Sequence, residues 1–286
     1  MSTICKIDTI LQAQPTMDGA GVKLNRVFGF YERGLMDPFL LLDFFGSDKP
    51  EDFIAGFPWH PHRGIETVTY ILEGSVEHGD SMGNSGIIHS GDIQWMTAGS
   101  GIIHQEMPKS TGGPMYGFQL WVNLPASRKM MPPRYQDIKA EEIPAVKAGK
   151  GISVKVVAGE FMNVKGPVKD IVADPEYFEL SVSPGNQFLF NVKQGHTVFA
   201  FVFKGEGNFD ETGSKPVKEG QLAKFSDGEQ VSVTTGPKEV RFLLVSGKPL
   251  HQPIAWGGPI VMNTEDEVTL AFKEYRSGTF IKGRDA

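Results

Sequence analysis

The sequence predicts an all-β protein with two similar β-rich halves and one helix at its C-terminal end. Three observations support this. Short apolar runs alternate with turn-forming residues at a spacing of about 8–12 residues, which is typical of a β-sandwich or barrel. The 286 residues include 34 glycines, 19 prolines and 20 phenylalanines, so turn-forming and β-forming residues are abundant. The runs TYILEG and GDIQWMTAG have weaker counterparts in the second half, FAFVFKGEG and GQLAKFSDG, in the same order.

The pattern of strands and turns divides the chain into two domains and a connector. The first domain is predicted over residues 1–133, with strands at KIDTILQA, FLLLDFF, ETVTYIL and YGFQLWVNL. Residues 134–148 are charged, contain Pro144 and have no strong periodic face, so they are interpreted as an exposed connector. The second domain is predicted over residues 149–286, beginning at ISVKVVAGEF and including the helix.

The helix is predicted to begin after Thr264 and to end at Gly278. Thr264 and Glu267 have the spacing of a capping box, and acidic residues occupy the first turn, where the helix dipole favours them. An apolar stripe follows at helical spacing, formed by Val268, Ala271, Phe272 and Tyr275. We interpret this element as a packing helix that carries no chemistry itself.

Composition and charge exclude several classes of function. The net charge is −6 and no basic cluster is present, which disfavours direct binding of nucleic acid. The single cysteine, Cys5, cannot form an internal disulfide, so the fold needs no oxidising compartment. The first residues lack the pattern of a signal peptide, and no run approaches the roughly 18 apolar residues of a membrane span. We therefore expect a cytoplasmic protein without membrane contact.

The run from Phe57 to Pro108 holds the candidate functional residues. His60 and His62 are two positions apart, as are His104 and Glu106, and residues i and i+2 of a β-strand point to the same face. Two such pairs on neighbouring strands would converge. The spacing predicts a site for one metal ion with three imidazole ligands and one carboxylate.

Two alternatives to this site remain open from spacing alone. Glu66 shares the parity of His60 and His62, so it competes with Glu106 for the carboxylate position. His60-Pro61-His62 on its own also fits a polar loop without metal, although the second histidine–carboxylate pair makes this reading less favourable. Imidazole suits Fe, Cu, Ni and Zn, and a carboxylate adds a preference for a harder ion such as Fe or Mn.

The remaining histidines are not predicted to bind metal. His78 and His89 lie in turn-like segments and are interpreted as solvated, with His78 near the barrel mouth as the alternative. After residue 150 the only histidines are His196 and His251, which are too far apart in sequence to form a local pair. We expect each of these two to be structural or exposed.

Apolar residues near the predicted ligands are mostly expected to belong to the core. Phe57 and Met107 are the first candidates to line a pocket over the metal. Arg63 follows the first histidine pair, and it either holds His62, Glu106 or an anionic substrate, or it makes an ordinary surface ion pair.

Several long motifs in the same order resemble the pirin family of the cupin superfamily. They are DPFLLLD, HPHRGIETVTYILEG, GDIQWMTAGSGIIHQEMP and GGPIVMNTEDEV, and the resemblance covers nearly the whole chain. It implies two cupin-type β-barrel (jelly-roll) domains packed face to face with a C-terminal helix, of which only the N-terminal domain holds metal. Carried over residue by residue, the ligands are His60, His62, His104 and Glu106. Glu66 becomes a candidate to contact these ligands without binding the metal itself.

The resemblance also implies an activity. Pirins are associated with quercetin 2,3-dioxygenase activity, so we expect one bound metal ion, Fe, with Mn, Ni or Cu as alternatives. Four protein ligands leave one or two positions open for a small aromatic enol or flavonol and dioxygen. Glu106 is the expected catalytic residue, taking the proton of a bound hydroxyl. The alternative is a metal- or redox-dependent protein-interaction module that regulates transcription or a metabolic enzyme.

Overall fold

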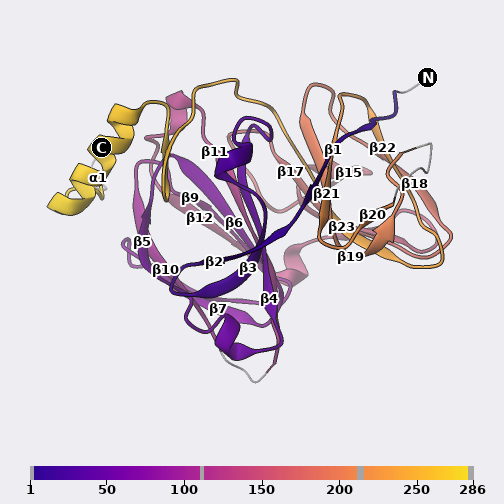
Figure 1. Ribbon diagram of the computed structural model, residues 1–286, viewed down its shortest axis with the longest axis horizontal. Coiled ribbons are helices and arrows are strands. Elements are labelled where there is room, and N and C mark those ends of the chain that lie inside the picture. The colour runs from indigo at the N-terminus through magenta and orange to yellow at the C-terminus, as the bar shows by residue number, and fades with distance from the viewer. Residues whose placement is uncertain (1–2, 110–112, 211–215, 283–286) are drawn as a thin grey trace. The chain divides into compact units, whose positions relative to one another are not determined.

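The computed structural model describes residues 3–109, 113–210 and 216–282, which form mainly β-strands (Figure 1). The chain folds into two compact units. Barrel A consists of Gln14–Ala140 with Leu250–Ala286, and barrel B consists of Met1–Ala13 with Glu141–Pro249. The predicted all-β fold with two barrels and a C-terminal helix is confirmed.

Barrel A is built from two antiparallel sheets. The larger sheet has seven strands in the order β12 (Arg134–Ile138), β9 (Ile93–Thr97), β6 (Ile65–Glu73), β11 (Met115–Asn123), β4 (Phe39–Ser47), β3 (Val22–Phe28), β2 (Gln14–Asp18). The smaller sheet has the order β5 (Phe57–His62), β10 (Ile102–Pro108), β7 (Ser75–Asp80), β8 (Ser85–His89). Short 3-10 turns lie at η1 (Phe30–Glu32), η2 (Pro50–Asp52), η3 (Ala126–Arg128) and η4 (Ala140–Glu142).

Barrel B repeats this plan with a smaller second sheet. Its main sheet runs in the order β1 (Ile7–Gln12), β21 (Gln221–Phe225), β19 (Thr197–Gly207), β23 (Val240–Gly247), β17 (Glu176–Val182), β14 (Ile152–Ala158), β13 (Ala145–Lys147), and β20 (Val217–Lys218) pairs with β19. Two-stranded sheets are formed by β18 (Gln187–Asn191) with β22 (Gln230–Thr234), and by β15 (Glu160–Phe161) with β16 (Val164–Lys165).

The two ends of the chain are exchanged between the units, which differs from the contiguous division predicted at 1–133 and 149–286. Strand β1 pairs antiparallel with β21, so the N-terminus completes the main sheet of barrel B. Helix α1 (Glu265–Ser277) packs on the hairpin of β24 (Ala255–Gly257) and β25 (Ile260–Met262), which belong to barrel A (Figure 1). Local sequence patterns do not record such long-range pairing. The expected face-to-face packing of the barrels stays a prediction.

The predicted exposed connector at 134–148 is a pair of edge strands. Strand β12 pairs with β9 in barrel A, and β13 pairs with β14 in barrel B. An edge strand needs only one hydrogen-bonded neighbour and tolerates charged side chains, so its composition resembles that of a loop. The boundary between the two units, at Ala140 and Glu141, falls inside this segment, and its role as a connector stays a prediction.

The predicted helix ends are confirmed. The hydroxyl of Thr264 accepts a hydrogen bond from the Glu267 N–H, and the Glu267 carboxylate accepts from the Thr264 N–H, so the capping box is complete. Gly278 ends the helix in the left-handed conformation with φ 74°. Val268 and Ala271 are buried in a cluster that includes Ala255 and Met262. The described residues include no helix that is long and apolar enough to cross a membrane.

The interiors of the two barrels differ. Barrel B is filled by a continuous cluster of twenty buried apolar residues, among them Phe178, Phe190, Phe209 and Phe242. In barrel A the inward-facing cluster around Phe45, Ile71 and Val76 is smaller. A second apolar cluster of barrel A includes Ile65, Met96 and Ile102, and polar side chains and a cavity occupy another part of its interior.

Candidate metal centre

A glycine turn and a strand pair bring the candidate histidines together. Strand β5 ends at His62, and Gly64 turns the chain into β6 with φ +80°; a Cβ at Gly64 would lie 2.0 Å from the Val261 carbonyl oxygen. Only glycine fits this position. Strand β10 pairs antiparallel with β5, with His104 opposite His60. The i, i+2 spacing on β5 then places His60 and His62 on the face that His104 also occupies.

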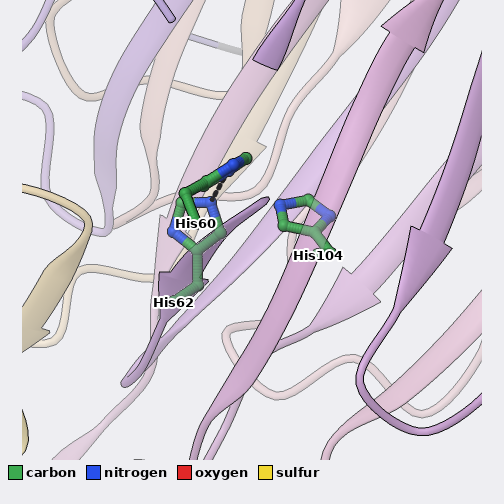
Figure 2. A group of neighbouring side chains, drawn as sticks. All are labelled: His60, His62 and His104. Atoms are coloured by element: carbon green, nitrogen blue, oxygen red, sulfur yellow. Dashed lines mark hydrogen bonds between the residues drawn. The ribbon is translucent and has the colours of Figure 1, made fainter. Parts of the chain in front are cut away.

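Figure 2 shows the three imidazoles turned toward one another, with the contact between His60 and His62 dashed. The ring centroids are 4.8 Å apart for His60 and His62, 4.4 Å for His60 and His104, and 5.1 Å for His62 and His104. One nitrogen of each ring lies within 4.8 Å of the others. Among the described residues, these three histidines form the one group of this kind.

Hydrogen bonds fix the tautomers of two rings. His60 Nδ1 lies 2.8 Å from the Pro58 carbonyl oxygen, and His62 Nδ1 lies 3.0 Å from that of Pro259. A carbonyl only accepts, so each Nδ1 carries the proton and each Nε2 presents a lone pair. The two Nε2 atoms are 3.0 Å apart. Two nitrogens bound at right angles, each about 2.1 Å from one metal ion, have about this separation.

His104 supplies the third lone pair. Its side chain is 1% exposed, and neither ring nitrogen has a hydrogen-bond partner among the described residues. A buried polar atom without a partner costs free energy, and a metal ion is one partner that would remove this cost. The residues present therefore fit a bound metal ion.

Burial favours the neutral form of the His62 and His104 rings. The pKa of His62 is lowered to about 3, mainly by desolvation and also by the neighbouring His60, against the hydrogen bond to Pro259. Burial also lowers the pKa of His104, with contributions from His62, His60 and His78. Neutral imidazole is the form that binds metal, so His62 and His104 are in their ligand form at neutral pH.

Glu106 lies close to the histidine group without being part of it. It is two positions from His104 on β10 and is 8% exposed, and its Oε1 accepts a hydrogen bond of 3.0 Å from the Thr69 hydroxyl. The pairing of β10 with β5 shifts between His104 and Glu106, so Glu106 stands opposite Phe57. Burial raises the pKa of the Glu106 carboxyl, although His60 and the Thr69 hydrogen bond lower it.

Glu66 is placed away from this group. It lies three positions before Thr69 on β6, so it projects from the opposite face of the sheet. Its Oε1 accepts a 2.7 Å hydrogen bond from Thr97. The parity argument that made Glu66 a rival of Glu106 fails because the turn at Gly64 interrupts the strand between His62 and Glu66.

The histidine group opens onto a cavity of about 650 Å³ inside barrel A. His60, His62 and Glu106 line it. Aromatic walls and polar groups form much of the remainder: Phe30, Phe45, Phe53, Phe57, Trp121 and Trp256, with Asp18, Arg26, Asp43, Thr69 and Gln119. The volume lies in the range of cavities that bind small molecules.

Phe57 lines the cavity as predicted, whereas Met107 is not among the lining residues. Met107 has the opposite parity to Glu106 on β10 and so faces the other side. Arg63 is 2% exposed and forms neither a surface ion pair nor a site contact. Its guanidinium pairs with Glu274 at 2.7 Å and donates to the carbonyls of Ser100 and Phe280, which joins α1 to the residue that follows β5.

The outcomes for the other histidines are mixed. His78 is not solvated: it is 4% exposed on β7, directly opposite Glu106 in the pairing with β10. Its glycine-flanked sequence suggested a turn, but the glycine is part of the strand. His89 and His251 are exposed, as expected. His196 lies 3.8 Å from Asp174 in barrel B.

Sequence reasoning missed several cavity residues. Asp43 and Gln119 stand inside apolar strands, and a lone polar residue in such a run is a signal that was available. Pro259 and Trp256 come from a segment about 200 residues after His60, and no local pattern connects them.

Comparison with known proteins gives consistent matches. The Pirin family model matches residues 21–122, and the model of the Pirin C-terminal cupin domain matches residues 177–281. A Pseudomonas aeruginosa protein named "Putative quercetin 2,3-dioxygenase" is 43% identical over 270 residues, 92% of this chain and 94% of that protein. A pirin-like protein of Caulobacter vibrioides is 40% identical and covers 95% of this chain and 97% of its own length.

A solved structure agrees with the sequence matches. The crystal structure of a quercetin 2,3-dioxygenase from Acinetobacter baumannii matches with a TM-score of 0.90 and 33% identity, covering 97% of this chain and 98% of that one. The match extends over both barrels, so each barrel has a cupin fold.

Proposed function

Because the chain belongs to the pirin family of the cupin superfamily, we propose that it is a metal-dependent dioxygenase that opens the ring of flavonols such as quercetin. The observation that supports this best is a group of three converging imidazoles, two of which line a cavity of about 650 Å³ that also carries aromatic side chains. The names of the Pseudomonas and Acinetobacter relatives support the same substrate class.

We propose that His60, His62, His104 and Glu106 hold one metal ion, and that this ion is Fe. Three imidazole nitrogens suit several transition metals, and the carboxylate favours a harder ion. Glu106 lies outside the histidine group but lines the same cavity as His60 and His62, and its carboxylate would be the fourth ligand. When bound, the metal ion would supply a Lewis acid and a redox centre for the reaction with dioxygen.

Glu106 is proposed as the base of the reaction. A flavonol hydroxyl that enters the cavity beside His60 gives its proton to the Glu106 carboxylate, which leaves an electron-rich enolate. Thr69 directs the Glu106 carboxylate through its hydroxyl. Burial of Glu106 raises its pKa, which makes the carboxylate a stronger proton acceptor than an exposed glutamate.

The aromatic walls position the substrate. The Trp121 ring packs edge-on against His62 with a centroid distance of 5.1 Å, and it lies 6.0 Å from the Trp256 ring. Flat aromatic ligands pack well against such rings, and the walls reduce the access of water to the proton acceptor.

Turnover measurements test the proposal directly. Protein loaded with Fe(II) is mixed with quercetin in air-saturated buffer, and oxygen uptake is followed together with the flavonol absorbance. We expect stoichiometric loss of both. His62→Ala abolishes turnover, whereas His89→Ala, which changes an exposed histidine of the same barrel, retains it. No oxygen uptake by the loaded native protein would overturn the proposed function.

A further inference from the structure

The cavity has a second polar region on the sheet opposite the histidine-bearing strands. Five side chains that line the cavity form it, and we refer to them together as the polar belt: Asp18, Arg26, Asp43, Gln119 and Thr69. Four of them are cross-strand neighbours in one row. Arg26 pairs with Asp43, Asp43 with Gln119, and Gln119 with Thr69, across β3, β4, β11 and β6.

Strong hydrogen bonds hold the two ends of the polar belt. Arg26 donates Nε to Asp43 Oδ1 at 2.8 Å and Nη2 to Asp43 Oδ2 at 2.8 Å, which is a bidentate ion pair. Nη2 also donates to Asp18 at 2.7 Å. At the other end, the Thr69 hydroxyl lies 2.7 Å from Gln119 Oε1 and 3.0 Å from Glu106 Oε1. The polar belt thus reaches from the proposed base to β3.

A role in folding alone does not account for this row. Asp43 is 5% exposed, and burial raises the pKa of its carboxyl despite the guanidinium of Arg26. A buried ion pair is often no more stabilising than apolar residues of similar volume. Barrel B shows that alternative: the corresponding strands β14, β17, β23 and β19 face its interior with Val156, Phe178, Leu180, Phe242, Leu244, Ala200 and Val202.

The polar belt keeps hydrogen-bonding capacity for a ligand. Arg26 Nη1 and the Gln119 amide nitrogen have no hydrogen-bond partner among the described residues, and the side chain of Asp18 is 51% exposed. Two carboxylates and one guanidinium give the end around β3 a net charge of −1. This charge repels carboxylate or phosphate groups, and it favours neutral groups that both donate and accept hydrogen bonds, such as phenolic hydroxyls.

The separation of the two ends sets the size of the ligand. Strands β6 and β3 are three positions apart in the sheet, and neighbouring strands are about 4.8 Å apart. A ligand that reaches from Thr69, beside Glu106, to Arg26 is therefore longer than a single aromatic ring.

We propose that the polar belt is the specificity site of the cavity, and that it binds the hydroxyl groups of a neutral polyphenol on the ring remote from the histidines. This inference rests on the proposed function, because it takes the reacting enol to lie at the histidines. Its substrate class is an uncharged, multi-ring polyphenol rather than a simple enol, an aromatic carboxylate or a phosphate ester.

Binding measurements with two matched flavonols test this assignment. Quercetin and 3-hydroxyflavone share the same enol and carbonyl, but 3-hydroxyflavone has no hydroxyl on either outer ring. Each is titrated anaerobically into Fe(II)-loaded protein, so binding is measured without turnover. The native protein is expected to bind quercetin at least about tenfold more tightly than 3-hydroxyflavone, since hydrogen bonds to charged groups discriminate by about this factor.

Substitutions in the polar belt assign the preference to these residues. Asp43→Asn is expected to weaken quercetin binding and leave 3-hydroxyflavone binding unchanged. Asp18→Asn, at a half-exposed position, gives a smaller loss of the same kind and serves if Asp43→Asn does not fold. Glu179→Gln is the matched control, because it breaks the comparable pair of Glu179 with Arg241 in barrel B; quercetin binding is expected to be unchanged.

The possible results separate this inference from the proposed function. The specificity site is overturned, and the dioxygenase stays in place, if the native protein binds the two flavonols with equal affinity. The same holds if Asp43→Asn and Asp18→Asn weaken the binding of both flavonols equally. A preference for quercetin that the variants abolish, without oxygen uptake, supports the specificity site and overturns the dioxygenase. Failure to bind either flavonol overturns both.

Discussion

The main sheets of the two barrels have the same strand order, but their inward-facing side chains differ. The order β12-β9-β6-β11-β4-β3-β2 of barrel A corresponds position by position to β1-β21-β19-β23-β17-β14-β13 of barrel B, whose main sheet has β20 as an eighth strand beside β19. The site strands β5 and β10 correspond to β18 and β22, which also pair antiparallel. The strand framework therefore does not determine which barrel has a site.

The inward side chains make the difference. Where β5 and β10 carry His60, His62 and His104, the pair β18 and β22 packs Phe188, Phe190, Val231 and Val233 in the apolar cluster. Barrel B uses its interior for stability, because buried apolar area is the main favourable term in folding. Barrel A buries less apolar area in its interior, because part of the space is a cavity lined with polar side chains. Function here depends on a few side chains carried on a shared framework.

The largest difference between the barrels is expected in metal affinity. His62→Ala removes one imidazole of the proposed site, so the affinity for Ni(II) or Co(II) should fall by at least about a hundredfold, more than the effect of removing a supporting hydrogen bond. The β-fold should remain, because the substitution touches neither apolar core. Isothermal titration measures the affinity, and circular dichroism measures the fold. Unchanged affinity, or global unfolding, would contradict the comparison.

Truncating a large apolar side chain should destabilise barrel B more than barrel A. Phe190→Ala opens a hole in the filled interior of barrel B and should lower the free energy of unfolding by about 3–5 kcal/mol. Phe57→Ala changes a partly exposed cavity wall of barrel A and should cost about 1 kcal/mol. Denaturant unfolding compares the two, with attention to separate transitions of the barrels. Equal losses would show that the interiors are not as different as proposed.

A buried lysine gives barrel A a pH dependence. Lys129 is 1% exposed, and its Nζ donates to Gly64 O, Asn123 Oδ1 and Val261 O at 2.7–2.9 Å. Burial lowers the pKa of Lys129 from 10.5 to about 7. Between these values the unfolded chain binds a proton that the folded chain lacks, so stability rises with pH.

The slope of this rise reaches about 1.4 kcal/mol per pH unit for one group. We expect it in the metal-free native protein between about pH 7 and 10, measured by urea unfolding. Lys129→Met should remove it, whereas Lys204→Met, at an exposed lysine of barrel B, should keep it. An identical slope in the Lys129 variant would assign the dependence to other groups.

The smallest effect is expected from the contact between α1 and the site. Glu274→Gln weakens the pair with Arg63, which follows His62 in the chain. The affinity for Ni(II) should fall by less than about tenfold, because the change reaches the ligand only through the backbone. Glu265→Gln, in the first turn of the same helix, is the control. If both variants bind metal like the native protein, α1 only packs against the barrel.

Local signals in the sequence predicted much of this organisation. The i, i+2 spacing predicted which histidines share a face, and the capping box and Gly278 predicted both ends of α1. Prediction from the sequence failed where the position of a residue depends on segments far away in the chain or on a turn that interrupts a strand. Nothing local shows that β1 pairs with β21, or that Pro259 bonds to His62. The even spacing of Glu66 from His60 and His62 was misleading, because the turn at Gly64 separates Glu66 from the strand that carries the two histidines.

The central claim is that one metal ion lies among the inward side chains of barrel A. An anomalous-difference map from a crystal of protein purified without added metal, recorded at the absorption edge of the ion found, locates it directly. We predict a single peak about 2.0–2.3 Å from His60 Nε2, His62 Nε2, one ring nitrogen of His104 and a carboxylate oxygen of Glu106. A peak in barrel B, or none between the three imidazoles, would contradict the account.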